Sequence, residues 1–588
     1  MPGETVWRGQ RRRRAACGTK RRHLLWLSLS LLGALWGAEA AMAQTASAVT
    51  PESFAPPRQA ATRPVTLSGP ATAPIPAGAD RLFVTLGDVV VADGYPAMAL
   101  AADKLRAALT GRTVSAAEIF RAAAALEADY AKAGFVLARV NLPPQTLRNG
   151  GTLRLEVING FVEKVDQTGV ADPVRTRINE LTGGLVERRG VTLRELERAL
   201  LLAGDTYGVA LGSTLSAGQQ PGGTQLILDT RFKPIVAFAG IDTNLAEDLG
   251  GLNLNAGISF NGLLKRGETF YLRASGSPDQ AFAARPQYRA LAGGVVLPLG
   301  KQGMTLNLEA TNSRSTPDSD ALPTTSDFTR YSARLYYPWI RSRALNFSGQ
   351  LSFDWQHDRQ WLLAGGGRIG LYEDQLSVLR LALNGDRTFD DGSLVQGGLI
   401  LSKGLDLFGA RRAAGAGGLL PLSRDGADAV FTKLTVGGSY RRPLPGDWAM
   451  ELTARMQTSF GDPLLTSEQM SLTGPKELSS FETGAVRGDS GAVIRAEISA
   501  PSRQIGGPVP FQLTPYAFGA YGVANLENPT VVEAGTVRAS ALGLGLSMDL
   551  MTGDGKPGGT ARLEYGRGQR NDDEPAGNRF SLVATLRF

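Results

Sequence analysis

The amino-acid sequence predicts a transmembrane β-barrel of about 16 antiparallel strands, preceded by two small α/β modules. Three observations support this fold class. From residue 234 to residue 588 apolar and polar residues alternate with period two, as in strands with one face in lipid. The connections between these segments are alternately short and long. No run of about 20 apolar residues follows the N-terminal leader, so a closed barrel is the remaining way to cross a membrane.

The alternation is clearest in the segments 252–260, 345–355, 542–550 and 580–588, which place apolar residues on one face. A soluble β-sandwich would also alternate, because its apolar face packs on a second sheet. The segments recur over the whole stretch, however, and are too many for one ordinary sandwich. An even number of strands also leaves both ends of the barrel on the side where the α/β modules must lie.

The lengths of the connections predict which end of the barrel faces outward. The short connections include 300–303 and 443–447, and the long ones include 311–325, 405–428 and 461–489. In outer-membrane barrels the short turns face the periplasm and the long loops face the outside. The aromatic residues fit the same orientation, because they are typical of girdles at the two membrane interfaces. The tryptophans that we interpret in this way are Trp339, Trp355, Trp361 and Trp448.

Residues 1–43 have the pattern of a secretory signal peptide. A basic segment is followed by an apolar run over residues 24–36 and by the small-x-small sequence Ala41-Met42-Ala43. About 13 apolar residues are too few to span ~30 Å of hydrocarbon as a helix, which argues against a membrane anchor. We therefore predict export and cleavage after Ala43.

Charge and composition exclude several function classes. The chain has 62 Lys+Arg and 55 Asp+Glu, but its excess of basic residues lies mostly in the leader, so no global field for nucleic acid remains. Cys17 lies in the leader, and His357 is the only histidine after it. A disulfide scaffold, a thiol nucleophile and a Cys/His metal site are therefore not expected. We interpret His357 as a loop histidine and predict no enzymatic activity, metal or cofactor.

Three segments precede the barrel. Residues 44–79 are rich in Pro, Ala and Thr and are predicted to be an extended linker. Residues 80–160 form the first module and residues 161–233 the second, poorer copy. In the first, strands are predicted at 82–91, 135–142 and 153–157 and helices at 97–109 and 115–133. In the second, helices are predicted at 173–181 and 193–202 and strands near 213–215 and 225–229.

Short motifs in both modules resemble those of the outer-membrane transporters of two-partner secretion, the TpsB or haemolysin secretion/activation family. The first module is similar to the family's first POTRA domain, although Asn159 replaces the usual acid. The residues that carry this similarity are Gly134, Phe135, Pro143, Pro144, Gln145 and Gly160. The sequence of residues 214–228 resembles the second POTRA domain, and Asp242-Thr243-Asn244 falls where the first barrel strand of the family has an Asp-Asn pair.

The resemblance also extends to a loop motif, Val486-Arg487-Gly488-Asp489, before the twelfth strand. In the family the arginine of a V-R-G-[YF] tip meets an acid on strand thirteen, inside the barrel. The matching stretch here contains Phe518, Ala520 and Gly522, so alanine stands at the position of the acid, and Asp489 replaces the aromatic residue. A guanidinium in a confined lumen requires a carboxylate. We expect Arg487 to anchor the loop through another acid, with Glu497 as the candidate, or else to be a solvated loop residue.

The family resemblance implies a function. The POTRA domains would lie in the periplasm and recognise an unfolded exoprotein, and the barrel would translocate it to the cell surface without nucleotide hydrolysis. The implied partners are one large haemolysin- or adhesin-like exoprotein, outer-membrane lipid and the barrel-assembly machinery, for which Phe588 would be the recognition signal. The alternative is an assembly factor of the same superfamily that inserts other barrels; a plain porin would not need the two modules. Whether the linker forms a plug helix in the lumen stays open.

Overall fold

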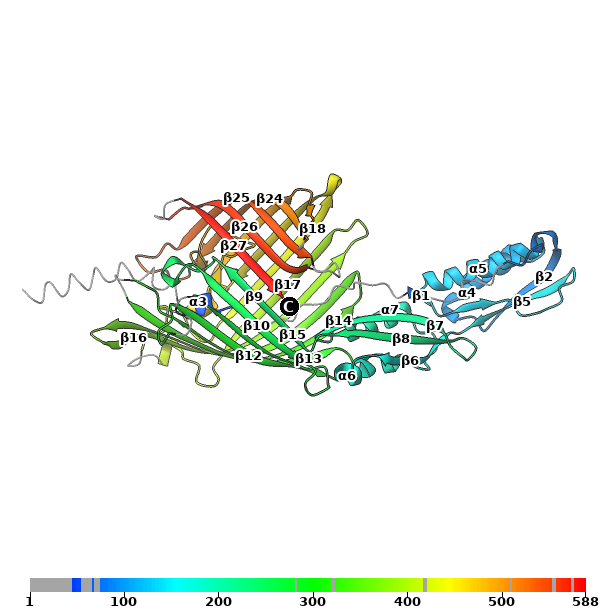
Figure 1. Ribbon diagram of the computed structural model, residues 1–588, viewed down its shortest axis with the longest axis horizontal. Helices are drawn as coiled ribbons and strands as arrows, with labels where there is room; N and C mark the ends of the chain where they lie inside the picture. Colours follow the sequence, from blue (N-terminus) through cyan, green and yellow to red (C-terminus); the bar gives the residue numbers. More distant parts are fainter. Residues whose placement is uncertain are drawn as a thin grey trace, which may run out of the picture.

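The computed structural model describes residues 45–53, 66–67, 75–278, 280, 283–319, 323–415, 420–507, 510–551, 557–572 and 576–588. The predicted signal peptide and most of the linker lie outside these residues. The POTRA-like modules extend from one end of a barrel that contains the rest of the chain (Figure 1).

The barrel is a single closed antiparallel sheet of 16 strands, which confirms the predicted fold class. Each strand pairs with its neighbours in chain order, and β27 closes the barrel against β9 by pairing Val583–Arg587 with Phe238–Asp242. A short strand, β23 (Arg503–Ile505), adds to the edge of β24. The barrel strands are β9 (Ile235–Asp242), β10 (Asn253–Asn261), β11 (Thr269–Gly276), β12 (Tyr288–Leu299), β13 (Met304–Ser315), β14 (Thr324–Arg341), β15 (Leu345–Ala364), β16 (Gly367–Thr388), β17 (Leu394–Leu405), β18 (Thr432–Leu444), β19 (Trp448–Thr458), β22 (Ser490–Ser499), β24 (Phe511–Asn525), β25 (Thr536–Met551), β26 (Pro557–Arg570) and β27 (Gly577–Arg587).

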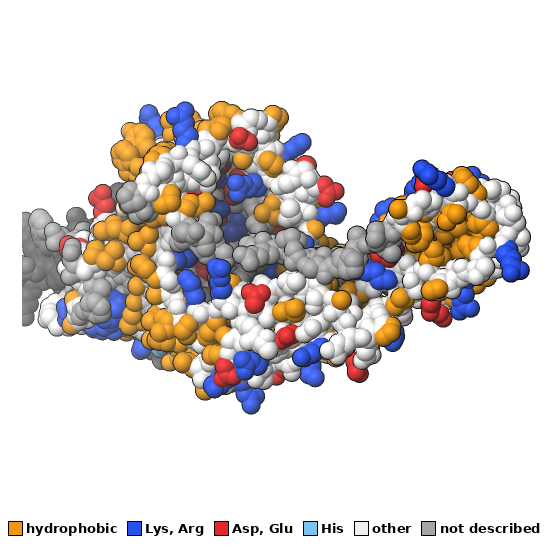
Figure 2. All heavy atoms as spheres, turned by 45° about the vertical axis from the view of Figure 1, so that its right-hand side comes forward, with side chains coloured by type: hydrophobic (Ala, Val, Ile, Leu, Met, Phe, Trp, Pro, Cys, Tyr) orange, Lys and Arg blue, Asp and Glu red, His pale blue; other side chains and the backbone are white. Residues whose placement is uncertain are grey.

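The two faces of the barrel differ as the alternation predicts. On β15 the apolar Leu345 and Leu351 are exposed on the outer surface, whereas Ser348 and Ser352 are buried toward the lumen. This arrangement places apolar side chains against lipid and polar ones inside. Figure 2 looks toward the mouth that carries the POTRA-like modules and shows basic side chains within it and hydrophobic side chains around it.

The predicted environment of His357 is wrong. It lies within β15 rather than in a loop, and its Nε2 is 2.8 Å from Oε1 of Glu373 on β16. Strand β15 is 20 residues long and continues well past the predicted strand end, because β14 and β16 extend with it and pair with its whole length.

The first module is a four-stranded sheet in the order β3-β2-β5-β4 with two helices. Its elements are β2 (Phe83–Ala92), α4 (Ala99–Leu109), β3 (Thr113–Ser115), α5 (Ala116–Lys132), β4 (Arg139–Asn141) and β5 (Gly151–Ile158). Helix α5 begins at a capping box between Ser115 and Glu118. Strand β4 is shorter than predicted, because Gly134 turns the chain at φ 96° and Phe135 packs its ring on Tyr95 instead of entering the sheet.

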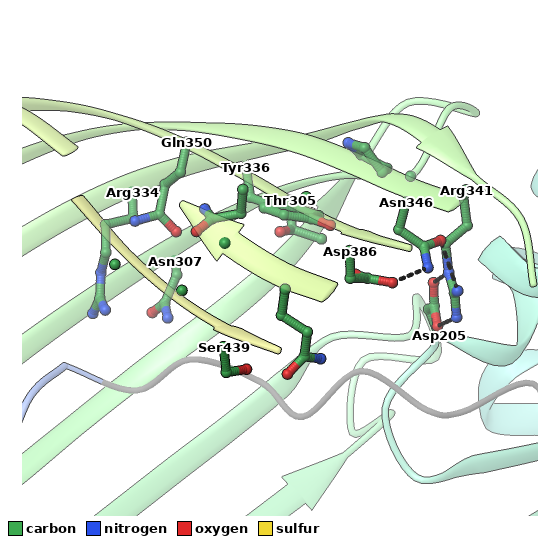
Figure 3. Close-up of a pocket in the computed structure, with 18 of the residues that line it drawn as sticks. Asp205, Thr305, Asn307, Arg334, Tyr336, Arg341, Asn346, Gln350, Asp386 and Ser439 are labelled. Carbon is green, nitrogen blue, oxygen red and sulfur yellow. Dashed lines mark hydrogen bonds and ion pairs between the residues drawn. The ribbon is translucent and has the colours of Figure 1, made fainter. Parts of the chain in front are cut away.

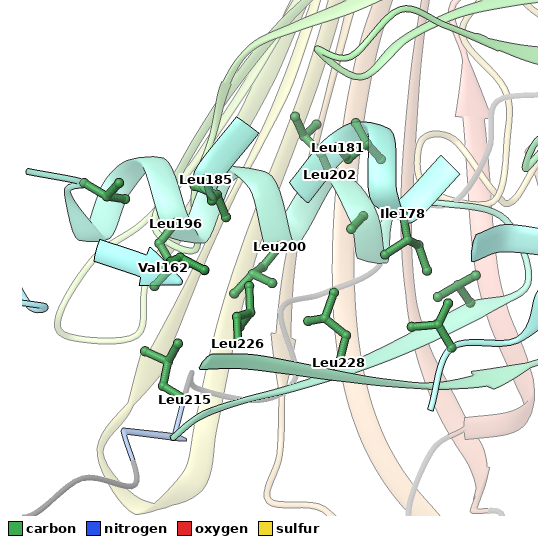
Figure 4. Close-up of a cluster of buried hydrophobic side chains, with 14 of the residues drawn as sticks. Val162, Ile178, Leu181, Leu185, Leu196, Leu200, Leu202, Leu215, Leu226 and Leu228 are labelled. Atoms are coloured by element: carbon green, nitrogen blue, oxygen red, sulfur yellow. The ribbon is translucent and has the colours of Figure 1, made fainter. Parts of the chain in front are cut away.

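The second module has the sheet order β1-β7-β8-β6 with two helices over one face (Figure 4). Its elements are β6 (Phe161–Gly169), α6 (Asp172–Thr182), α7 (Leu193–Gly204), β7 (Val209–Ala217) and β8 (Gly223–Phe232). Leu196 and Leu200 of α7 lie on one helix face and pack with Leu226 and Leu228 of β8. The remaining strand comes from the linker, since β1 (Thr66–Leu67) pairs in parallel with β7.

Polar contacts join the second module to the barrel. Arg341 is the last residue of strand β14. Its Nε and Nη2 each lie 2.8 Å from an oxygen of Asp205. Arg198 of α7 donates to the carbonyl of Pro338 at 2.8 Å, and Lys265 pairs with Asp172 at 2.8 Å. These contacts orient the module at the periplasmic mouth.

Candidate functional site

The long connection between β19 and β22, which we call loop six, folds back into the barrel. It contains the short helix η7 (Thr466–Glu468) and a hairpin of β20 (Met470–Ser471) and β21 (Arg487–Gly488). The predicted motif Val486-Arg487-Gly488-Asp489 is therefore the returning arm of this hairpin. Its place inside the barrel agrees with the position that the family resemblance implies.

One side of loop six packs on strand thirteen, β24, through apolar residues. Leu472 and Leu478 of the loop are fully buried, and a Cβ on Gly522 would lie 3.1 and 3.2 Å from their Cδ1 atoms. Phe518 and Ala520 of the same motif belong to this cluster and are almost completely buried. The strand-thirteen motif thus contacts the loop, but by apolar packing where the family has an acid.

Arg487 lies on the other side of the hairpin and is partly buried. Burial lowers the pKa of its guanidinium to about 10, while Tyr372 and Asp358 act in the opposite direction. Asp358 of β15 is thus an acid whose charge acts on Arg487. Asp358 is completely buried and is paired in register with Asp374 of β16, which is buried as well.

Glu497, the predicted partner of Arg487, occupies a different place. Its Oε2 lies 3.2 Å from Nη2 of Arg495 and 2.7 Å from Nη2 of Arg562. These two arginines also bind Glu564, which accepts hydrogen bonds from Ser479 of loop six and from Tyr516 of β24. The prediction that Glu497 pairs with Arg487 is therefore corrected. Its carboxylate is bound instead by Arg495 on its own strand and by Arg562 on β26.

Three carboxylates of loop six form ion pairs that the sequence alone did not reveal. Asp489 is fully buried, and both of its oxygens accept from Nη1 of Arg424, at 2.6 and 2.7 Å. Glu468 lies 2.5 Å from Nη2 of Arg380 and 2.8 Å from Nζ of Lys433. Glu477 is the third carboxylate, and it accepts from Arg455 of β19 at 2.6 and 2.7 Å.

The charges around Glu468 stabilise its ionised form. Burial by itself would raise the pKa of this carboxyl, but the charges of Arg380 and Lys433 and their hydrogen bonds outweigh it. The pKa of Glu468 is consequently held well below its usual range. A buried carboxylate with two cationic partners is a strong anchor for the loop, because the loss of either partner would leave buried charge uncompensated.

The start of the predicted linker also lies in the lumen and is helical there, not extended. The four-residue helix α3 (Ala46–Val49) contacts β13, β14 and η7. The amide of Ala46 donates to Oγ of Ser326 at 2.6 Å, and the Tyr288 hydroxyl donates to the carbonyl of Val49 at 2.8 Å. A helix of one turn therefore occupies the lumen beside loop six.

The lumen opens toward the second module in a cavity of about 970 Å³. Asp205 and Tyr207 of the module and Asn307, Arg334 and Asn346 of the barrel line this cavity (Figure 3). Asn346 donates to Asp386 at 2.7 Å and accepts from Arg341 at 3.1 Å. Charged and amide side chains thus line the cavity together with apolar ones such as Leu202 and Val296.

The residues of the first module that carry the family resemblance stabilise its fold and its junction with the second module. The Gln145 side chain donates to the carbonyl of Arg154 at 2.8 Å and accepts from its amide at 2.9 Å, and so completes the edge of β5 beside Pro143 and Pro144. Asn159 joins the two modules, since its Oδ1 accepts from Tyr95 and from the Gly190 amide. A Cβ on Gly160 would lie 1.9 Å from the Leu137 carbonyl, so only glycine fits this junction.

No group of three or more His, Cys, Asp or Glu side chains in the described part of the chain is arranged to hold a metal ion. Within the same residues, no helix is both long and apolar enough to span a membrane.

Fold and lumen together define an outer-membrane barrel transporter with periplasmic POTRA domains. Residues 222–547 match the family model of the haemolysin secretion/activation proteins ShlB/FhaC/HecB, and residues 90–160 match the ShlB-type POTRA domain. The chain belongs to this haemolysin secretion/activation family, whose members act in two-partner secretion. It is accordingly an outer-membrane protein whose family translocates exoproteins.

Similar proteins include two kinds of transporter. The outer membrane transporter CdiB of Escherichia coli O6:K15:H31 is 25% identical over 432 residues, which are 72% of this chain and 70% of the relative. The heme/hemopexin transporter protein HuxB of Haemophilus influenzae is 23% identical over 455 residues, 74% of this chain and 76% of the relative. The solved structure of CdiB from Escherichia coli has the same fold, with a TM-score of 0.67, 20% identity and coverage of 95% of this chain and 98% of that chain.

Proposed function

We propose that this protein transports one large haemolysin- or adhesin-like exoprotein, which the POTRA domains recognise unfolded and the barrel passes outward without nucleotide hydrolysis. The observation that supports this proposal best is the polar lumen, which opens beside the second POTRA domain and is occupied by loop six. A plain diffusion pore would need neither the docked domain nor a loop held by several buried ion pairs.

Exposed strand edges supply a means of recognition. Strand β2 pairs with β3 only over Phe83–Thr85, and β7 pairs with β1 only at Thr214 and Leu215. Among the described residues, the rest of the outer edge of β2 offers backbone donors and acceptors to an incoming extended chain. Binding through the backbone suits an unfolded exoprotein, because it makes few demands on side chains.

Loop six is proposed to gate the passage, with Arg487 as part of its anchor. Asp358, whose charge acts on Arg487, also has a hydrogen bond from Ser47 of α3. The loop and the N-terminal segment therefore meet at the same buried carboxylate. Passage of an exoprotein requires both to leave the lumen, so we propose that release of one weakens the hold on the other.

The proposed function is tested by comparing the culture-supernatant proteins of a deletion strain with those of its parent. We expect one large protein to be lost and to return when the gene is restored. An unchanged supernatant together with a general fall in outer-membrane barrels would contradict transport and favour the assembly factor. Any nucleotide requirement is tested separately, with purified protein in liposomes that contain unfolded cargo and no nucleotide.

A further inference from the structure

Charged side chains form one continuous row on the outer surface of five neighbouring strands. In the strand register, each residue of this row lies directly opposite the next residue of the row, on the neighbouring strand. The row runs from β12 to β16 as Arg289, Arg314, Asp327, Arg359 and Glu373. On β15 the residues on either side of the row, Asp358 and Gln360, are buried toward the lumen, so Arg359 points outward.

The row lies just beyond the lipid-facing band, at the end of the barrel away from the POTRA domains. Two aromatic pairs mark the band on the outer surface: Trp339 stacks on Phe347 near the periplasmic end, and Tyr331 stacks on Trp355 toward the other end. From Phe347 to Arg359 the strand rises about 40 Å, which at a tilt of about 40° is about 30 Å of height. The apolar band of an outer-membrane barrel is about 25 Å tall. Arg359 therefore reaches the headgroup layer of the outer leaflet.

The acids in this region are already used by other side chains. Asp327 is bound to Arg314, and Glu373 lies 2.8 Å from His357 and 3.8 Å from Arg411 of the loop after β17. With Arg368 at the start of β16 included, four arginines stand against two acids on this surface. The patch keeps an excess of positive charge at a depth where lipid phosphates lie.

Arg359 and Arg368 are the arginines best placed to bind a ligand. Their guanidinium groups lie 5.4 and 5.6 Å from the ring of Trp361, so one tryptophan orients both. Among the described residues, no ion pair joins either of them to an acid. Stacking leaves the N–H donors of a guanidinium available, and their forked geometry matches the oxygens of a phosphate.

We propose that this surface binds lipid A, the phosphorylated glycolipid anchor of lipopolysaccharide, with Arg359 and Arg368 holding a phosphate group. The acyl chains would lie along Leu351, Phe353 and Leu379, which are apolar and face outward below the row. Phosphate on a lipid that carries several acyl chains satisfies both the charged row and the apolar surface beneath it. The inference rests on the location of the protein in the outer membrane and is independent of the proposed transport of an exoprotein.

The test uses full-length protein purified in mild detergent and bisphosphorylated lipid A as the probe. We expect the double variant Arg359→Gln/Arg368→Gln to bind this lipid about 30-fold more weakly than wild type, because each arginine near a phosphate surface contributes about fivefold. The control is Arg441→Gln/Arg442→Gln, which removes the same charge at the periplasmic end of β18 and should bind as wild type does. Equal binding by the two double variants would overturn the proposal.

A second measurement needs no variant. Wild-type protein should bind dephosphorylated lipid A about as weakly as the Arg359→Gln/Arg368→Gln protein binds the phosphorylated lipid. Equal affinity of the wild-type protein for both lipids would also overturn the proposal. Secretion of the exoprotein is scored in parallel: loss of lipid binding with secretion intact supports the lipid site alone, and a wild-type strain that secretes nothing contradicts the transport function alone.

Discussion

Loop six contacts the barrel in two different ways on its two sides. Toward β24 and β25 it packs Leu472, Leu478 and Val486 into an apolar cluster. Toward β15–β19 it is held by carboxylates paired with Arg380, Arg424, Lys433 and Arg455. Apolar contacts are lost as soon as the surfaces separate slightly, whereas removal of one member of a buried ion pair leaves a charge buried without its partner. We therefore expect the ionic side to oppose release of the loop more strongly and the apolar side to fix its resting position.

The largest effect is expected from Arg424→Ala. This change leaves Asp489 fully buried without its guanidinium partner, and loss of one member of a buried pair costs about 3–5 kcal/mol. Urea titration of the purified protein should show this loss, and planar-bilayer recordings should show a more conductive pore. Lys476→Ala is the control on the same loop, because its pair with Glu451 is exposed and contributes about 0–1 kcal/mol. Equal stability of the two variants would contradict the assignment of the ionic side.

Leu478→Ala tests the apolar side and should have the next largest effect. Leu478 is completely buried against Gly522, so its truncation should cost about 2–4 kcal/mol. The same urea titration measures it. We expect a smaller rise in conductance than for Arg424→Ala, because the ion pairs still hold the loop in the lumen. A more conductive pore in the leucine variant would reverse the roles that we give to the two sides.

A double-mutant cycle between Arg487→Gln and Asp358→Asn should give a coupling energy of about 1–3 kcal/mol. The physical reason is their electrostatic interaction inside the lumen, away from bulk water. The matched cycle replaces Asp358→Asn by Glu497→Gln and should give less than about 0.5 kcal/mol, since the carboxylate of Glu497 is bound by Arg495 and Arg562. Stronger coupling to Glu497 would restore the pairing that was predicted from the sequence.

The smallest effect concerns Glu482, at the edge of loop six, whose pKa is raised by burial despite the nearby charge of Arg579. When folding raises the pKa of a carboxyl, the ionised group is less stable in the folded protein than in the unfolded chain. Such a carboxyl destabilises the folded protein above its folded pKa and has no effect on stability below its unfolded pKa. Glu482→Gln should therefore slightly stabilise the protein at pH 7, and the advantage should vanish below about pH 4. An advantage that grows on acidification would show that the carboxylate is stabilising.

The sequence was sufficient to predict the barrel, because alternation is local and repeats in every strand. It also located the Val486-Arg487-Gly488 tip and the Phe518–Gly522 stretch, which do meet through loop six. These features depend on period two and on short motifs. The alternation and the motifs can both be recognised without knowing which strands face each other across the lumen.

The partners of the loop could not be predicted in the same way. Asp358 and Arg487 are far apart in the chain, and only the closed barrel brings β15 to face loop six. Glu497 is close to Arg487 in sequence, which made it the natural candidate, but strand register places it beside Arg495 and Arg562. Asp489 was noticed as a departure from the motif, while its partner Arg424 lies in a separate loop that carries no sequence signal.

The seam between β27 and β9 joins the chain's first and last barrel strands through only five residue pairs, from Asp242–Val583 to Phe238–Arg587. Contacts between residues so distant in sequence are slow to form, because a long loop must be closed before they contribute. Until this seam forms, β9 and β27 leave the two edges of the sheet exposed. Formation of this short seam therefore turns the sheet into a closed barrel, and a chain without these β27 residues would keep two open strand edges.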